Sequence, residues 1–151
     1  MATQRRYYIG LMSGTSMDGV DGVLAEFSAP ASARGDRQSQ PAVAEKPEAP
    51  PRAEIHVVAE ASLALPAALR AELMALNSPG PDELARSALA AAQLAQQYAQ
   101  VVAALLYRGE VEAHEVVAIG AHGQTVRHRP DLGYTIQLNN PSLLAELTGI
   151  A

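Results

Sequence analysis

The sequence has no cysteine and no tryptophan, and its aromatic residues are limited to five tyrosines and one phenylalanine. The lack of cysteine excludes a disulfide framework and thiolate chemistry. Lys46 is the only lysine, so the chain cannot form the lysine-containing Walker A loop of P-loop proteins. No apolar run approaches the roughly 18 residues of a membrane-spanning helix. These absences exclude several common classes of enzyme and membrane protein.

Charge and the first residues limit the expected partners further. The net charge of -5 argues against non-specific binding to nucleic acid. Arg5 and Arg6 precede an apolar run that Ser13 soon interrupts, and this run is too short for a secretory leader. We therefore expect a soluble, cytoplasmic protein with neither a nucleic-acid nor a membrane partner. The 151 residues are enough for one ordinary domain with a buried core.

A polar turn, residues 13–19, stands between two apolar stretches near the amino terminus. The flanking stretches, 6–12 and 19–27, are predicted as strands. Gly14 and Gly19 can take positive φ and let backbone N–H groups approach a ligand closely. Hydroxyl groups in the turn can donate hydrogen bonds to phosphate oxygens, and successive N–H groups form an anion-binding concavity. These hydroxyls belong to Ser13, Thr15 and Ser16.

Two carboxylates accompany this turn. Asp18 would repel phosphate unless a cation lay between them, so its presence suggests Mg²⁺, bound directly or through water. Asp21 either faces the ligand or caps the turn. The alternative interpretation of the whole stretch is an ordinary hairpin with a polar loop.

Residues 28–54 differ in composition from the rest of the chain. They hold five of the ten prolines, and Val43 is their only large aliphatic residue. Such a segment cannot bury enough apolar area to offset the entropy cost of ordering it. We expect a disordered insertion between adjacent strands.

The remaining sequence alternates between predicted strands and helices, which indicates an α/β fold. The second strand is apolar on both faces, and this predicts a sheet that is covered on both sides. A long helix is indicated by apolar residues at alternating intervals of four and three, and Gly109 is expected to end it. That stripe consists of Leu84, Ala88, Ala91, Ala95, Tyr98, Val102 and Leu105. Strands are expected at 55–61, 116–120 and 134–138, and helices at 66–76, 82–107 and 141–147.

The segment His122-Gly123-Gln124-Thr125 follows the predicted strand 116–120 directly. In open α/β sheets ligands bind beyond the carboxyl ends of strands, so this polar loop is a second candidate site. Gln124 and Thr125 can donate and accept the hydrogen bonds needed to recognise sugar hydroxyls and an amide. His122 either orients a ligand group or ties down its own loop. Arg127 and Arg129 either meet an acidic ligand group or are solvated.

Three sequence blocks resemble one known family. The first is Gly10-Leu11-Met12-Ser13-Gly14-Thr15-Ser16-Met17-Asp18-Gly19-Val20-Asp21. The second runs from Ala118 to His128, and the third runs from Ile136 to Ile150. Together, and in this order, they resemble the 1,6-anhydro-N-acetylmuramic acid kinases, which belong to the actin/hexokinase/Hsp70-like ATPases.

The resemblance implies an actin-like ATPase fold of the RNase H-like type, with a mixed sheet, flanking helices and ATP in a cleft between two domains. The implied reaction opens the 1,6-anhydro ring and phosphorylates O6, giving N-acetylmuramic acid 6-phosphate during recycling of cell-wall murein. The implied cofactors are ATP and Mg²⁺. The implied cofactor-binding residues are Gly14, Thr15, Ser16, Met17, Asp18, Gly19, Val20 and Asp21, with Asp18 also at the metal, and the implied substrate-binding residues are His122, Gly123, Gln124 and Thr125.

Two positions depart from the family pattern. Actin-like loops usually carry an aspartate where Met12 stands, so the metal role would move to Asp18 or Asp21. Many relatives have a Gly-Asp pair where this chain has Asn139-Asn140.

The matching region is the amino-terminal portion of the family. The aspartate base and the adenosine pocket of the family follow the Thr-Gly-Ile block, so we expect the carboxyl-terminal domain to be absent and the 151-residue chain to be inactive alone. A homodimer is compatible with the complete protein. Two alternatives remain: another sugar or acetate kinase of the same superfamily, and a non-catalytic nucleotide-binding fragment.

Overall fold

The computed structural model describes residues 6–14, 16–28 and 54–151. The expected insertion at 28–54 therefore lies outside the described residues, except for its two end positions. Those ends, Ser28 and Glu54, are strand residues that pair with each other.

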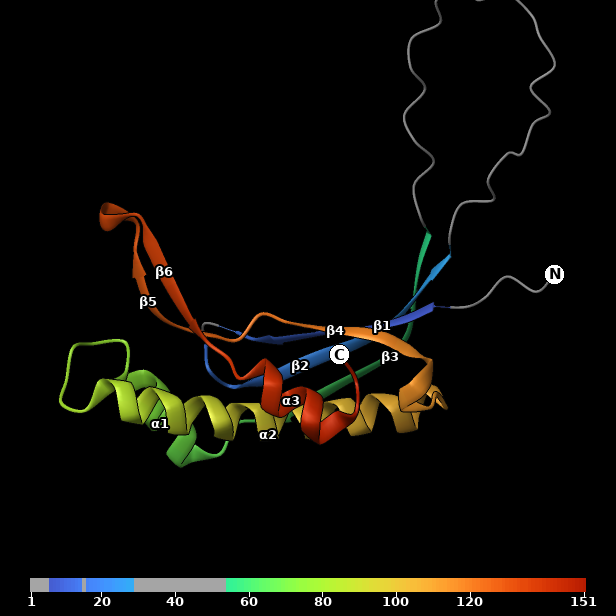
Figure 1. Ribbon diagram of the computed structural model, residues 1–151, viewed down its shortest axis with the longest axis horizontal. Coiled ribbons are helices and arrows are strands. Elements are labelled where there is room, and N and C mark those ends of the chain that lie inside the picture. Colours follow the sequence, from blue (N-terminus) through green and yellow to red (C-terminus); the bar gives the residue numbers. More distant parts are fainter. Residues whose placement is uncertain (1–5, 15, 29–53) are drawn as a thin grey trace, which may run out of the picture.

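Four strands form a mixed sheet (Figure 1). They are β1 (Arg6–Ser13), β2 (Gly19–Ser28), β3 (Glu54–Ala64) and β4 (Val116–Ala121). Their spatial order is β3-β2-β1-β4. The neighbours β1/β2 and β2/β3 are antiparallel, whereas β1 and β4 are parallel. The two strands predicted on either side of the polar turn are confirmed, and so is the α/β fold with a mixed sheet.

Three helices lie on one face of this sheet (Figure 1). They are α1 (Ala67–Ala75), the long α2 (Glu83–Gly109) and α3 (Pro141–Thr148). Since no helix of the described residues covers the opposite face, the expectation of a sheet covered on both sides is wrong for this part of the chain. No described helix combines the length and the hydropathy required to cross a membrane.

A second, two-stranded sheet stands beside the first. It consists of β5 (Gln124–Arg129) and β6 (Tyr134–Leu138), which pair antiparallel and project as a hairpin (Figure 1). The strand expected at 134–138 is confirmed. The predicted loop at 122–125 is corrected, since its second half begins β5, which periodicity did not reveal. The 3₁₀ turns Ala113–Glu115 and Pro130–Leu132 complete the described elements.

The core forms where α2 packs on β2 and β3. Tyr98, Leu94 and Leu105 have no exposed surface. The apolar stripe predicted for this helix is buried from Ala91 onward, but Leu84 is 89% exposed. The stripe is therefore wrong at its amino-terminal end, because the first turns of α2 extend past the sheet. Ala88 is exposed as well, whereas Ala90, Leu94 and Val101 are buried outside the predicted stripe.

Gly109 does not end α2 in the expected way. It is the last helical residue, and the left-handed position at the helix end belongs to Glu110, with φ of 52°. Gly109 instead serves close packing, because a Cβ atom there would lie 2.5 Å from Leu24 Cδ2. The caps of α3 are as predicted: Asn140 Oδ1 accepts from Leu143 N at 3.1 Å, and Gly149 has φ of 69°.

Gly22→Ala is expected to destabilise the domain by about 1–3 kcal/mol, the usual cost of overpacking a core. A Cβ atom at Gly22 would lie 2.5 Å from Val101 Cγ1, where β2 touches α2. Urea unfolding measures the effect. The matched control is Gly120→Ala, whose new Cβ would have no neighbour closer than 3.9 Å. Equal stability of the two variants would contradict this packing argument.

Candidate functional site

The turn between β1 and β2 is shaped by close backbone approaches. Met17 N donates to Gly14 O at 3.0 Å. The positive φ in the described part of the turn belongs to Met17, at 54°, and the conformational freedom of Gly14 and Gly19 is not used in this way. Gly19 is required for another reason, because a Cβ atom there would lie 2.7 Å from Leu63 O. The buried Met17 side chain anchors the turn in the core.

A hollow of about 340 Å³ opens beside this turn, and we call it the turn hollow. It gathers five of the eight residues expected to bind the cofactor, together with three from β3. Of the remaining three, Met17 and Val20 point into the core, and Thr15 lies outside the described residues. The lining residues are Gly14, Ser16, Asp18, Gly19, Asp21, Ser62, Leu63 and Ala64.

Asp18 has a basic neighbour that the sequence did not reveal. Arg70 Nη2 lies 3.2 Å from Asp18 Oδ1 and 3.5 Å from Ser16 O. Leu65 N donates to Asp18 O at 3.1 Å, and this contact brings the start of α1 beside the turn. Both charged side chains of the pair are about half exposed or more, so the pair contributes little stability. No sequence signal marks Arg70, because its place depends on how β3 leads into α1.

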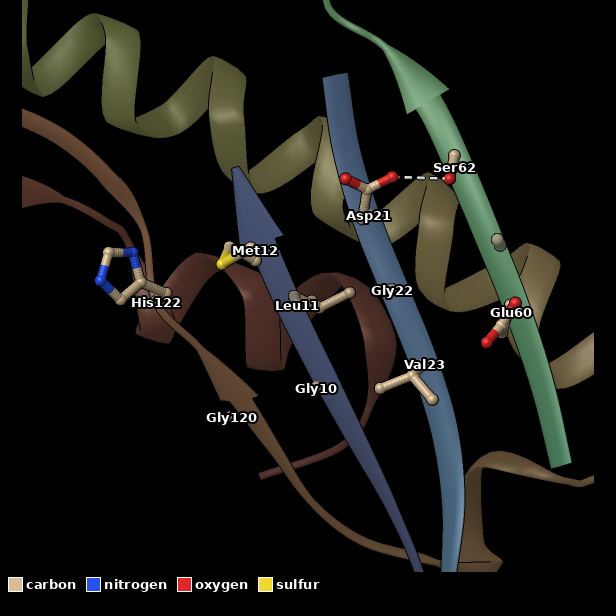
Figure 2. A pocket seen from close by; sticks show the side chains of 11 residues that line it. Gly10, Leu11, Met12, Asp21, Gly22, Val23, Glu60, Ser62, Gly120 and His122 are labelled. Carbon is tan, nitrogen blue, oxygen red and sulfur yellow. Dashed lines mark hydrogen bonds between the residues drawn. The ribbon is translucent and has the colours of Figure 1, made fainter. Parts of the chain in front are cut away.

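Asp21 is held by Ser62, a second residue that the sequence analysis missed. Ser62 Oγ donates to Asp21 Oδ1 at 2.6 Å, as Figure 2 shows. The two residues are direct partners across β2 and β3. Only the strand register could have revealed this pair, since the residues are separated by the insertion.

A larger hollow, of about 560 Å³, lies on the open face of the sheet, and we call it the sheet hollow (Figure 2). It shares Asp21 and Ser62 with the turn hollow. Three glycines and one alanine are among its eleven lining residues, and their lack of bulk leaves space above the backbone. Its lining residues are Gly10, Leu11, Met12, Asp21, Gly22, Val23, Glu60, Ala61, Ser62, Gly120 and His122.

His122 stands at the end of β4, at the edge of the sheet hollow (Figure 2). Its backbone N donates to Leu11 O at 3.0 Å, which continues the parallel pairing of β4 with β1. Its Nδ1 lies 3.1 Å from Gly123 O. The ring is thus tied to its own loop while remaining exposed.

Gln124 points away from both hollows and is buried, with 1% of its surface exposed. Its Oε1 accepts from Ser13 Oγ at 2.5 Å, and its Nε2 donates to Thr125 O at 3.3 Å. Thr125 Oγ1 accepts from Gln137 Nε2 at 3.4 Å. The buried amide of Gln124 therefore links the segment 122–125 to Ser13, the first residue of the polar turn.

The arginines and asparagines whose roles the sequence did not decide have partners within the protein. Arg127 Nη2 lies 2.7 Å from Glu83 Oε2, so β5 is fixed to the start of α2. Arg129 pairs with Asp131, and its hydrogen bond holds the pKa of that carboxyl below its usual value. Asn139 Nδ2 donates to Ala121 O at 3.0 Å.

The side chains that line the turn hollow fit Mg²⁺ as a partial set of ligands, with water and phosphate completing the coordination shell. The described residues contain no group of three or more His, Cys, Asp or Glu side chains that could hold a metal by themselves. Mg²⁺ usually binds one or two carboxylates and completes its shell with water and substrate phosphates. Asp18 and Asp21 both line the turn hollow and supply that number of carboxylates.

Comparison with known proteins identifies the family to which the sequence belongs. The sequence profile of the family described as anhydro-N-acetylmuramic acid kinase matches residues 6–151. The kinase of that name from Bordetella petrii is 53% identical over 99% of this chain and 34% of its own length. Those from Bordetella pertussis and Variovorax paradoxus are 54% and 53% identical, over 96% and 95% of this chain and 32% and 33% of their own lengths. The chain spans about a third of these curated relatives, and it belongs to the anhydro-N-acetylmuramic acid kinase family.

Proposed function

We propose that this chain supplies the phosphate-binding part of an ATP-dependent kinase that acts on 1,6-anhydro-N-acetylmuramic acid. The observation that carries the proposal is the turn hollow, where two carboxylates, a hydroxyl and two glycines of the polar turn and β2 meet. Family membership and the adjoining sheet hollow support it. The reaction opens the anhydro ring with water and transfers the γ-phosphoryl group of ATP to O6. Its products are ADP and N-acetylmuramic acid 6-phosphate, as in murein recycling.

The proposed fold of the complete protein is the actin-like, RNase H-like ATPase fold. The mixed sheet with an antiparallel β1-β2-β3 and a parallel β4 supports this assignment. In this proposal residues 1–151 form the amino-terminal part of one domain, and the nucleotide lies between that domain and a carboxyl-terminal domain. The complete protein is proposed to work in the cytoplasm, as a homodimer.

Each turn residue has a proposed role in holding the triphosphate. Backbone N–H groups of the turn, except that of Met17, which is bonded to Gly14 O, donate to the β- and γ-phosphates together with the Ser16 hydroxyl. Asp18 and Asp21 would hold Mg²⁺, and the bound ion would supply positive charge to balance the charge that develops during phosphoryl transfer. Ser62 holds Asp21 in place.

The segment His122–Thr125 is the proposed sugar side of the site. The His122 ring is exposed at the sheet hollow, where it can meet a sugar hydroxyl or carboxylate. Gln124 is buried, so its proposed contribution is to hold Gly123 and Thr125 in place.

The proposal is tested with a chimaera, in which residues 1–151 replace the matching third of the Bordetella petrii kinase. The chimaera, given Mg-ATP and 1,6-anhydro-N-acetylmuramic acid, is expected to form the 6-phosphate, detected by mass spectrometry. A panel of other sugars and acetate tests the alternative kinases of the superfamily. A folded chimaera that stays inactive beside the active parent kinase would reject the proposal and favour a non-catalytic nucleotide-binding fragment.

Ser62→Ala is expected to lower the turnover of the chimaera by about tenfold, because loss of a hydrogen bond to a charged group costs roughly 1.5 kcal/mol. The Asp21 carboxylate would then be free to rotate away from the turn hollow. Ser28→Ala is the matched control, since Ser28 Oγ also donates across β2 and β3, to Glu54 O, at the opposite end of the strands. Equal turnover of the two variants would count against a role for Asp21 in the site.

A further inference from the structure

Ser13 and Gln124 form a polar contact in the interior of the protein. Tyrosines apart, they are the two buried polar residues in the described part of the chain, with 4% and 1% of their surface exposed. Ser13 Oγ donates to Gln124 Oε1 at 2.5 Å, although 111 positions separate the residues. An apolar pair of the same shape would be about as stable, because a buried hydrogen bond replaces bonds that both groups make with water. Stability alone therefore does not account for this pair.

The pair lies where the main sheet divides. β1 pairs with β4 as far as Leu11, whose carbonyl oxygen also accepts from His122 N at 3.0 Å. Beyond this point β1 continues to Ser13 and the polar turn, whereas the segment that follows β4 passes through Gly123 into the β5–β6 hairpin (Figure 1). The side chains of Ser13 and Gln124 bridge these two segments after their backbone pairing has ended.

Both ends of this bridge are held in place. Ser13 is a paired residue of β1, and Gln124 Nε2 donates to Thr125 O at 3.3 Å. Gly123 has φ of 78°, and a Cβ atom there would meet Leu138 O, so the backbone beside Gln124 has little freedom. Because a hydrogen bond fixes distance and direction more narrowly than an apolar contact does, a shift of one segment is expected to move the other.

The structure also changes the role expected for the Ser13 hydroxyl. The sequence indicated a donor to phosphate, but a hydroxyl has one proton, and that of Ser13 is donated inward to Gln124. Ser13 lines neither the turn hollow nor the sheet hollow. Its hydroxyl thus acts on the neighbouring segment and not on a ligand.

We propose that Ser13 and Gln124 are positioning residues, whose buried hydrogen bond fixes the polar turn relative to the segment 122–125, so that the phosphate side and the sugar side of the site keep one relative arrangement. Neither side chain touches a ligand. The consequence for catalysis rests on the function proposed above, whereas the coupling of the two segments concerns this chain alone.

A double variant, Ser13→Ala with Gln124→Met, removes the bond without leaving either partner buried and unpaired. Methionine is unbranched and fills a space of irregular shape, so this variant is expected to unfold at nearly the same urea concentration as the parent chain. The matched control is Thr148→Val. It removes another hydroxyl hydrogen bond, from Thr148 Oγ1 to Leu144 O at 2.8 Å, in a helix that lines neither hollow.

The first test compares the ligand-free 151-residue chain, the double variant and the control by NMR. In the double variant, hydrogen exchange is expected to accelerate at least about tenfold at one backbone amide in each segment, as for local opening. These amides are Met17 N, which is bonded to Gly14 O in the turn, and His122 N, which is bonded to Leu11 O. Exchange in β3 of the double variant, and at both amides of the control, is expected to stay unchanged.

The proposal is overturned if neither amide responds, if only one responds, or if exchange accelerates throughout the protein. The last result, like global unfolding of the double variant, would assign the bond to core stability.

A second test measures the kinetics of the chimaera with both substrates. Because the bond sets one side of the site relative to the other, its loss is expected to lower kcat at least about tenfold, as misplaced reactants do. The KM for Mg-ATP is expected to change less than about threefold, since the contacts to each substrate alone remain. Thr148→Val is expected to match the parent chimaera.

An unchanged kcat, or a higher KM at unchanged kcat, would contradict the proposed positioning. If the unsubstituted chimaera is inactive, the proposed function fails, while the ligand-free comparison still decides whether the bond couples the two segments.

Discussion

Asp18→Ala is expected to lower the turnover of the chimaeric kinase by at least about 100-fold, equivalent to roughly 2.7 kcal/mol of transition-state stabilisation. Asp18 lines the turn hollow, where its carboxylate would help to hold the proposed Mg²⁺. Removal of a charge that positions the metal weakens the electrostatic stabilisation on which phosphoryl transfer depends. Steady-state assays with Mg-ATP measure the loss.

The same substitution is expected to leave the fold intact. The ion pair between Asp18 and Arg70 is solvent-exposed on both sides, and exposed pairs contribute about 0–1 kcal/mol. The control for a lost exposed aspartate is Asp131→Ala, which removes the comparable pair with Arg129 on the β5–β6 hairpin. Its turnover and its melting temperature are expected to change little.

Arg70→Ala distinguishes two roles of the Asp18 carboxylate, which are binding of the metal and the ion pair with Arg70. It removes the same ion pair while the carboxylate stays in place. A turnover close to that of the unsubstituted chimaera would assign the Asp18 effect to the metal. A loss as large as that of Asp18→Ala would show that the ion pair, and not a metal, is what the site needs.

Local sequence patterns predicted a helix or strand well where the residues that determine it are contiguous in the sequence. The leucines at 65, 69, 73 and 76 are all buried, as their spacing indicates for the helix near 66–76. The caps of α3 depend only on Asn140, Pro141 and Gly149, and all three are in their expected positions. The hairpin of β1 and β2 also follows from contiguous residues.

Predictions failed where the cause lies between distant segments. Nothing near Leu84 indicates that the sheet ends before the first turns of α2, so that leucine was placed in the core. The role of Gly109 depends on Leu24, which is far away in sequence. The missed strand β5 is an exception, because its partner β6 is close in sequence; its pattern is too short to be distinguished from a loop.

The candidate site shows the same division. The polar turn was found from its own residues, since the glycines, hydroxyls and carboxylate are contiguous. Arg70 and Ser62 were missed, because they reach the site through the β2–β3 register and the connection to α1. Gln124 was expected to face a ligand from its chemistry and from the family resemblance, and only the three-dimensional structure shows its inward bond to Ser13.

The 151-residue chain by itself is expected to bind Mg-ATP weakly, with a Kd of about 1 mM, equivalent to roughly -4 kcal/mol. The proposed phosphate contacts lie in an open hollow, and Ser16, Asp18 and Asp21 are exposed to solvent. Water competes for each hydrogen bond in such a site, so each contact contributes little net free energy. In the proposed two-domain arrangement, adenosine is held by the second domain.

The same chain is expected to form no detectable 6-phosphate from 1,6-anhydro-N-acetylmuramic acid. The proposal places the base that activates water in the part of the relatives that this chain does not span, and phosphoryl transfer needs that base together with the positioned metal. Calorimetry measures Mg-ATP binding, and mass spectrometry measures product, with the active chimaera as the positive control. Micromolar binding, or product made by the 151 residues alone, would show that adenosine binding and water activation reside within this chain, and the proposed division between the two domains would then be wrong.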